Sequence, residues 1–167
     1  VKDWNSVPEE YEKAHCLDFY GGDLEGITQK IPYLKKLGIT AIYLNPIFYG
    51  ATVHKYDCLD YFHVDPHFGG DEAFEELCKE LHKNDIKIIL DVSINHTGIA
   101  CKWFNRDGTF FPKSQGAFNN PDSEEREFHF FEKDNSYKSW FNVTTLPTLN
   151  YTSEKLRNRL YRDSDSL

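Results

Sequence analysis

The chain has 167 residues, which is enough for one domain with a substantial hydrophobic core. It carries 27 acidic and 19 basic side chains, and its net charge of −8 disfavours nucleic acid as a partner, because phosphates require a basic surface. No apolar run is long enough to span a membrane and no signal-peptide core opens the sequence, so a cytoplasmic location is expected, with secretion left open. The four cysteines form no CxxC pair and are expected to be reduced thiols, with no zinc site.

Residues 1–20 are polar without a clear period and are expected to form a loop. The spacing of apolar residues over 21–37 then predicts a helix. Asp23 is the expected N-cap of this helix, and Gly38 is its expected stop. Pro32 lies inside the same stretch and is expected to kink the helix or split it into two.

Two strands and a second helix follow in alternation. Residues 39–44 are apolar and β-branched, which is typical of a strand covered on both faces. A loop then precedes a helix over 71–84, whose apolar residues recur every three or four positions. A strand over 86–92 comes directly afterwards. This order, with short links, predicts an α/β fold with parallel strands.

The regular pattern stops over 97–152, a stretch far longer than an ordinary connection. Its many aromatic residues argue against disorder, so a small folded excursion is expected. A final helix is predicted over 153–162, with Leu156 and Leu160 on one side.

Polar side chains gather after both predicted strands, at the strand ends where ligands bind in parallel α/β folds. They are His54, Lys55, Tyr56, Asp57, Asp60 and Tyr61 after the first strand, and Asp91, Asn95 and His96 after the second. Because both strands end at one edge of a parallel sheet, the two clusters are expected to converge on one pocket. Each residue also has a structural explanation: Asp91 as a cap, His96 as a satisfied histidine, Tyr56 as a packed aromatic. Their joint placement favours function.

The chain contains five ordered segments that resemble the α-amylase family of glycoside hydrolases (glycoside hydrolase family 13). These are FYGGDLEGI, GITAIYLNPIF, HKYDCLDYFHVDPHFGG, ILDVSINHTG and LPTLNY. The combination of GGDL, HKYD and LPxLN is most similar to the branch of cyclomaltodextrinases, neopullulanases and maltogenic amylases. That branch often has MPKLN where this chain has LPTLN.

The resemblance implies an incomplete (β/α)₈ barrel, of which residues 39–44 and 86–92 would be the second and third strands. Residues 21–96 would be the partial barrel, preceded by the loop at 1–20. Residues 97–152 would form the family's inserted domain B, and 153–167 would return to the barrel.

The resemblance also implies roles for four residues in binding an α-glucan oligosaccharide. Tyr56 matches the aromatic residue that stacks on the sugar beside the cleaved bond, and Asp57 matches a carboxylate that hydrogen-bonds hydroxyls of that sugar. His96 matches a histidine that contacts the same sugar. Asp91 matches an aspartate that orders the region of the catalytic arginine.

Calcium is a further expectation from the resemblance. Asn95 matches a position that touches calcium in some relatives, and Gly21 and Asp23 match ligands of another calcium site, whose usual partners lie upstream. Ser93 departs from the family, which usually has Val there, and a small polar residue is expected to loosen the local packing without changing the functional positions.

The resemblance places the catalytic nucleophile and the acid/base on the fourth and fifth barrel strands, which this chain does not reach. A retaining glycosidase needs both carboxylates, so the chain alone is expected to be inactive. It contains no methionine, which indicates a processed or excised piece or a sequence with residues missing. We therefore expect it to act together with the remainder of a longer polypeptide, because an open part of a barrel exposes strand edges and apolar surface.

The leading hypothesis is thus part of a hydrolase acting on α-1,4 bonds in cyclomaltodextrins, maltodextrins or related α-glucans, and a homodimer is considered for the parent. A 4-α-glucanotransferase or an α-glucosidase of the same family is the alternative within the enzyme class. A non-catalytic carbohydrate-binding barrel is the alternative outside it. Neither a nucleic acid nor a membrane is expected as a partner.

Overall fold

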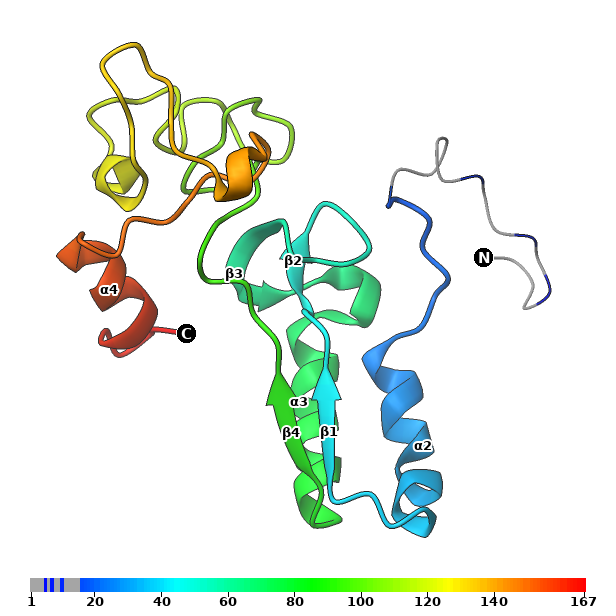
Figure 1. Cartoon of the computed structure of the whole chain (residues 1–167). Helices are drawn as coiled ribbons and strands as arrows, with labels where there is room; N and C mark the ends of the chain where they lie inside the picture. Colours follow the sequence, from blue (N-terminus) through cyan, green and yellow to red (C-terminus); the bar gives the residue numbers. More distant parts are fainter. Residues whose placement is uncertain (1–4, 6, 8–9, 11–15) are drawn as a thin grey trace. The chain divides into compact units, whose positions relative to one another are not determined.

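The computed structural model describes residues 5, 7, 10 and 16–167 (Figure 1). These residues form two compact units. The first consists of the described residues up to Lys55 together with His63–Val92, and the second consists of Tyr56–Phe62 and Ser93–Leu167. Most of the loop predicted for residues 1–20 lies outside the described residues.

Helix α2 of the first unit (Leu24–Lys36) has the ends that its sequence predicts. The Asp23 carboxylate accepts a hydrogen bond of 2.7 Å from a backbone N–H of the first turn, and Gly38, with φ of +79°, follows the last turn. Pro32 was expected to kink this stretch or to split it, and the split is wrong, because Pro32 lies inside one continuous helix. Packing of one side of the helix holds it together, because Ile31 is buried in the core of this unit.

Strands β1 (Ala41–Leu44) and β4 (Lys87–Leu90) pair in parallel, with Ala41 opposite Lys87 and Leu44 opposite Leu90. Helix α3 (Gly70–Lys83) connects them in the chain and packs against α2 (Figure 1). The expected order of helix, strand, helix and parallel strand is confirmed.

One face of this two-stranded sheet is open within the unit. Exposed and half-buried residues alternate along both strands, and Tyr43 and Ile89 are 61% and 50% exposed. Burial on both faces was expected and is not found here, because α2 and α3 supply side chains to one face only. The residues buried in the core are Leu24, Ile31, Ile47, Val64, Leu77, Leu81 and Ile86.

Two further strands lie where the sequence predicted a loop. Strand β2 (Phe48–Gly50) pairs with β3 (Cys58–Val64), and a short 3-10 helix, Pro66–Phe68, follows β3. Residues 58–62 of β3 belong to the second unit, whereas the last two residues belong to the first. The expectation of a loop here is wrong. The polar residues of β3 are typical of a loop, but Asp60 is buried in the folded chain.

The long stretch after β4 is folded, as expected, although it contains only 3-10 helices (Glu124–Phe128 and Trp140–Asn142) and isolated bridges. Aromatic rings form its core. Phe104 is fully buried and contacts the rings of Phe118, His129, Phe131 and Tyr137 at centroid distances of 4.7–5.5 Å. Aromatic pairs of this kind replace the aliphatic layers of a regular fold.

Helix α4 (Glu154–Tyr161) closes the second unit. The Ser153 hydroxyl caps it, and Leu156 and Leu160 are fully buried, which confirms the predicted amphipathic helix.

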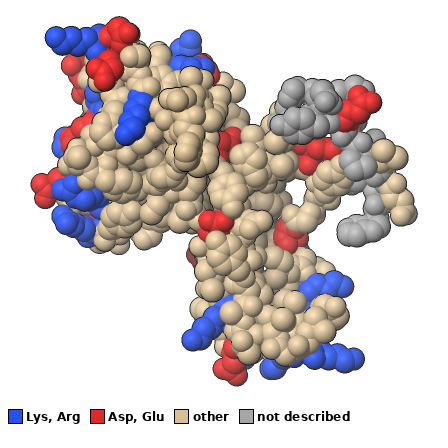
Figure 2. Space-filling model, in the orientation of Figure 1, with Lys and Arg blue, Asp and Glu red and all other residues tan. Residues whose placement is uncertain are grey.

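On the face drawn in Figure 2, basic and acidic side chains of the described residues are interspersed. In the part of the chain that the structure describes, no helix has the length and apolar character needed to cross a membrane.

Candidate functional site

The candidate site forms in the second unit, where the chain entering β3 meets the segment after β4. The backbone N–H of Gly98 donates to the Cys58 carbonyl over 2.9 Å. A Cβ atom on Gly98 would lie 2.5 Å from the carbonyl oxygen of Asp57, so only glycine allows this approach. The approach brings Tyr56 and Asp57 next to the segment that carries His96.

The backbone carbonyl of Tyr56 joins the two segments. It accepts hydrogen bonds from the Ser93 hydroxyl, at 2.8 Å, and from His96 Nε2, at 3.1 Å. A valine side chain cannot donate the first of these bonds. Ser93, the residue that departs from the family pattern, is buried and adds a hydrogen bond between the two segments.

His96 is neutral and carries its ring proton on Nε2. It is 4% exposed, and burial lowers its pKa, although the Tyr56 carbonyl and the Asp57 charge oppose this shift. Because a carbonyl only accepts, Nε2 must be the donor, and Nδ1 is then an acceptor. This Nδ1 is buried and has no hydrogen-bond partner among the described residues, which is an unusual state for a buried polar atom.

Tyr61 fixes the backbone beneath the site. Its side chain is fully buried, and its hydroxyl lies 2.9 Å from the Ser93 carbonyl and 2.6 Å from the His96 carbonyl. A single phenol thus holds the two residues that bind the Tyr56 carbonyl.

Replacing Tyr61 by phenylalanine is expected to lower the free energy of unfolding by about 1–3 kcal/mol, because the buried carbonyls of Ser93 and His96 lose the one hydroxyl proton that they share. Urea unfolding followed by fluorescence measures this change. Tyr33→Phe is the matched control, since Tyr33 is 59% exposed, and its effect should stay within about 0.5 kcal/mol. Equal changes in the free energy of unfolding for the two substitutions would show that the Tyr61 hydroxyl does not stabilise this backbone.

The LPTLN segment supports His96 from the other side. His96 pairs with Thr148 in an antiparallel bridge, the Thr97 N–H donates to the Pro147 carbonyl, and the Leu149 N–H donates to the Asn95 carbonyl. The segment therefore acts through its backbone, which fixes its register against residues 95–97.

Two aromatic residues that the sequence did not single out as site residues complete the cluster. The Trp140 ring lies 5.2 Å from the His96 ring, and the Phe141 ring lies 4.8 Å from that of Trp140. Tyr56, Trp140 and Phe141 are 38%, 41% and 81% exposed. The sequence signal that could have identified them is the presence of two adjacent aromatic residues in a polar stretch just before LPTLN.

Four other residues of the first predicted cluster have structural partners. His54 is exposed next to Thr52, and Lys55 is buried against Asp65 in the first unit. In the second unit, Asp60 forms an ion pair with Lys102 at 2.6 Å, and the hydroxyl of Tyr61 bonds to the backbone, as described above. These residues build the scaffold around Tyr56 and Asp57.

Asp91 belongs to the first unit. It lies beside Tyr43, whose pKa is raised by partial desolvation and by the Asp91 carboxylate. The structure thus brings Tyr56, Asp57 and His96 together within one unit, and the inclusion of Asp91 in the same pocket stays a prediction.

The residues expected to bind calcium do not form a metal site by themselves. Asp23 caps α2, Gly21 is exposed with φ of +83°, and Asn95 is an exposed residue of the other unit. Among the residues that the structure describes, no group of three or more His, Cys, Asp or Glu side chains is placed to hold a metal ion. Calcium binding at these positions stays a prediction.

Comparisons with known proteins give consistent matches. The family described as alpha amylase, catalytic domain, matches residues 4–166. The intracellular maltogenic amylase of Bacillus subtilis (strain 168) is 38% identical over 143 residues, which cover 86% of this chain and 21% of that protein. The cyclomaltodextrinase of Thermoanaerobacter pseudethanolicus is 50% identical over 98 residues, covering 59% of this chain and 16% of that protein.

The solved structures agree with these relatives. The type III pullulan hydrolase from Thermococcus kodakarensis aligns with a TM-score of 0.76 and 31% identity, over 93% of this chain and 26% of its own. The chain therefore spans about a fifth or less of the curated relatives above, and about a quarter of this structure.

Proposed function

This chain belongs to the α-amylase family, and we propose from that premise that it is part of a retaining glycoside hydrolase that cleaves α-1,4-glucosidic bonds. The proposed substrates are cyclomaltodextrins, maltodextrins or related α-glucans. Support comes from relatives whose names are maltogenic amylase, cyclomaltodextrinase and neopullulanase.

Family membership implies a (β/α)₈ barrel, and the parallel pair of β1 and β4 fits two adjacent barrel strands. We assign them as the second and third strands, within a partial barrel over 21–96. Residues 97–152 are proposed as the inserted domain B, and 153–167 as the return to the barrel. The folded aromatic core of the long insertion supports this assignment.

The arrangement around His96 carries the functional proposal. An exposed Tyr56 ring, the Asp57 carboxylate and a neutral histidine with an unpaired acceptor nitrogen lie together. A sugar requires such a set: an aromatic face for its C–H groups and acceptors for its hydroxyls. Tyr56 is proposed to stack on the sugar beside the cleaved bond, Asp57 to accept from its hydroxyls, and His96 to contact the same sugar. Asp91 is proposed to order the region of the catalytic arginine.

Bond cleavage itself needs two carboxylates about 5 Å apart, one as nucleophile and one as acid/base. We propose that residues beyond this chain in a longer polypeptide supply both. Asp57 and Asp91 are not candidates for these roles, because the resemblance assigns them to binding and positioning.

The proposal is tested by assaying the longer polypeptide and the 167-residue chain side by side on cyclodextrin, pullulan and maltotriose. The longer polypeptide is expected to hydrolyse at least one of these, and the chain alone is expected to release no sugar. Turnover by the purified chain would contradict the assignment of the carboxylates to other segments. Products longer than the substrate would indicate a glucanotransferase. Binding without turnover by the longer polypeptide would indicate a carbohydrate-binding barrel.

A further inference from the structure

We propose that Trp140 and Phe141 form an aromatic platform that extends the sugar site and binds glucose units beyond the one held by Tyr56 and His96. The inference rests on the proposed function and adds the part of the site that selects long α-glucans over short ones.

The exposure of the two rings is the first observation. Phe141 is 81% exposed and Trp140 is 41% exposed, whereas Trp103, Phe104 and Phe128 of the same unit are buried. The unit therefore has an aromatic core from which these two side chains are left out. An exposed phenylalanine next to an exposed tryptophan is typical of a binding surface.

The backbone that presents these rings is the second observation. Phe141 and Asn142 are consecutive residues in the left-handed region, with φ of 47° and 62°. This conformation is unfavourable for a bulky residue, and such residues cluster at ligand sites. The Val143 N–H donates to the Trp140 carbonyl, and the Trp140 N–H donates to the Leu146 carbonyl, each over 2.9 Å. A closed turn thus holds Phe141 away from the core.

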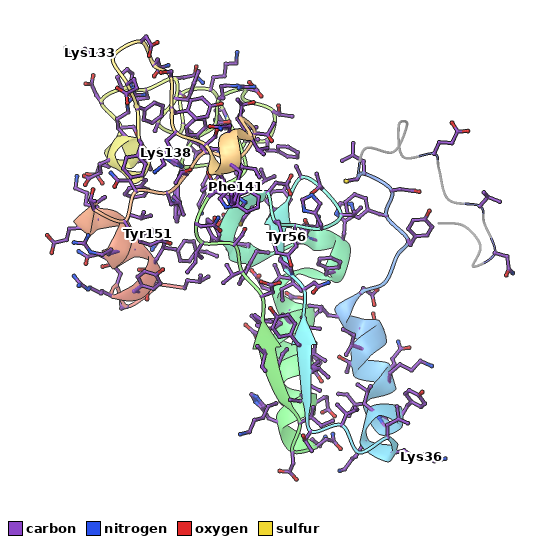
Figure 3. All side chains as sticks on the ribbon, viewed as in Figure 1. Lys36, Tyr56, Lys133, Lys138, Phe141 and Tyr151 are labelled. Atoms are coloured by element: carbon purple, nitrogen blue, oxygen red, sulfur yellow. The ribbon has the colours of Figure 1, made fainter. Side chains whose placement is uncertain are left out.

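The platform is continuous with the candidate site. Trp140 lies between the two, with its ring 5.2 Å from that of His96 and 4.8 Å from that of Phe141. The bridge between His96 and Thr148 fixes the backbone after this turn to the backbone of the site. Tyr56 and Phe141, which are labelled in Figure 3, both belong to the second unit.

The chemistry of the rings fits an extended sugar chain. Stacking on a sugar needs an aromatic face that is not occupied by a cation. The nearby Phe130 ring has Lys138 Nζ at 5.1 Å from its centroid, but neither Trp140 nor Phe141 has such a contact among the described residues. The two rings meet edge to face at 84°, so their faces point in different directions.

Phe141→Ala in the longer polypeptide tests the platform. Its KM for maltoheptaose is expected to rise about three- to tenfold with kcat unchanged, because stacking that is equal in ground and transition states is lost. Its KM for maltotriose should change less than about twofold, since a short chain stays near Tyr56 and His96. Phe141→Tyr keeps the ring and should retain wild-type KM for both. Phe110→Ala is the matched control, because Phe110 is a 43% exposed phenylalanine of the same unit.

The outcomes separate this inference from the proposed function. If the wild type hydrolyses neither substrate, the proposed function fails, and the platform fails with it. If the wild type is active but Phe141→Ala has wild-type KM for maltoheptaose, only the platform is wrong. Equal loss on both substrates, or the same change in Phe110→Ala, would assign Phe141 a structural role and also overturn the inference.

Discussion

Replacing Lys55 by methionine is expected to lower the free energy of unfolding by about 3–5 kcal/mol, because it leaves a buried carboxylate without its counter-ion. The side chains of Lys55 and Asp65 have no exposed surface, and Lys55 Nζ lies 2.6 Å from Asp65 Oδ2. Methionine has a similar length and fills the space, so the lost charge is the main change.

The surrounding contacts show that this pair organises the turn between β2 and β3. Lys55 Nζ also donates to the Gly50 carbonyl at 2.9 Å, and Asp65 accepts from the backbone N–H groups of Gly50 and His67. Burial alone would raise the pKa of Asp65, but hydrogen bonds from Lys55, His67 and Gly50 outweigh it and lower the pKa. The stabilisation by this carboxylate is therefore present above about pH 4 and lost as the pH falls through its lowered pKa.

Chemical denaturation of the wild type and the variant at pH 7 measures the effect. Lys79→Met is the matched control, because Lys79 forms an exposed pair with Glu76 at 3.8 Å and should change stability by less than about 1 kcal/mol. Removing both charges with Lys55→Met and Asp65→Asn should recover part of the loss. A loss below about 1 kcal/mol in the single variant would show that the Asp65 charge does not depend on Lys55.

Mild acid is expected to destabilise the second unit, because His129 stays neutral in the folded protein. His129 is 3% exposed, and burial lowers its pKa to about 3. The unfolded chain takes up the proton near pH 6.5, so each pH unit below that value costs about 1.4 kcal/mol until the folded pKa is reached. The free energy of unfolding lost through His129 therefore amounts to about 2–3 kcal/mol at pH 4.5.

Unfolding free energies at pH 7, 5.5 and 4.5 for the wild type and His129→Gln isolate this contribution. Glutamine does not titrate, so the variant should lose less stability over this range, by about 2–3 kcal/mol at pH 4.5. His82→Gln is the control, because it makes the same substitution at an exposed position on α3. Identical slopes in the wild type and His129→Gln would contradict the buried neutral state. The lowered pKa of His96 acts in the same direction and remains in both proteins.

The helices of this chain follow from local sequence. Asp23 and Ser153 cap α2 and α4 as their positions predict, and the apolar stripe of α3 faces the core through Leu77 and Leu81. These features depend on residues within one or two turns of each other, so periodicity and capping rules find them. Pro32 shows the limit of such rules, because tertiary packing keeps its helix continuous.

Strand β3 was missed because its burial depends on distant partners. Asp60 gives it a polar composition, yet this residue is buried through its ion pair with Lys102. Likewise Lys55 was expected among the polar residues of the pocket, and it is buried with Asp65 in the first unit. A charged side chain can be buried only when its partner is in place. The partner of Asp60 is Lys102, which lies far along the chain.

The site was predicted in part. Tyr56 and Asp57 directly precede β3 and His96 follows β4, and all three belong to the polar clusters that the sequence singled out. Ser93 and Tyr61 act on backbone carbonyls, and Trp140 reaches His96 through the bridge to Thr148. Backbone acceptors are the same at every residue, so nothing in the sequence distinguishes the carbonyls that these side chains bind.

The bridge between His96 and Thr148 also has a consequence for folding. It joins residues about fifty positions apart, and the entropy of closing such a loop must be offset by the aromatic core that the loop encloses. The surroundings of His96 are therefore expected to be assembled late, after Phe104 and its neighbouring rings have packed. A single protease cut within the loop would leave two separate chains, which must associate before this bridge can form. The rate of refolding after such a cut is therefore expected to depend on protein concentration.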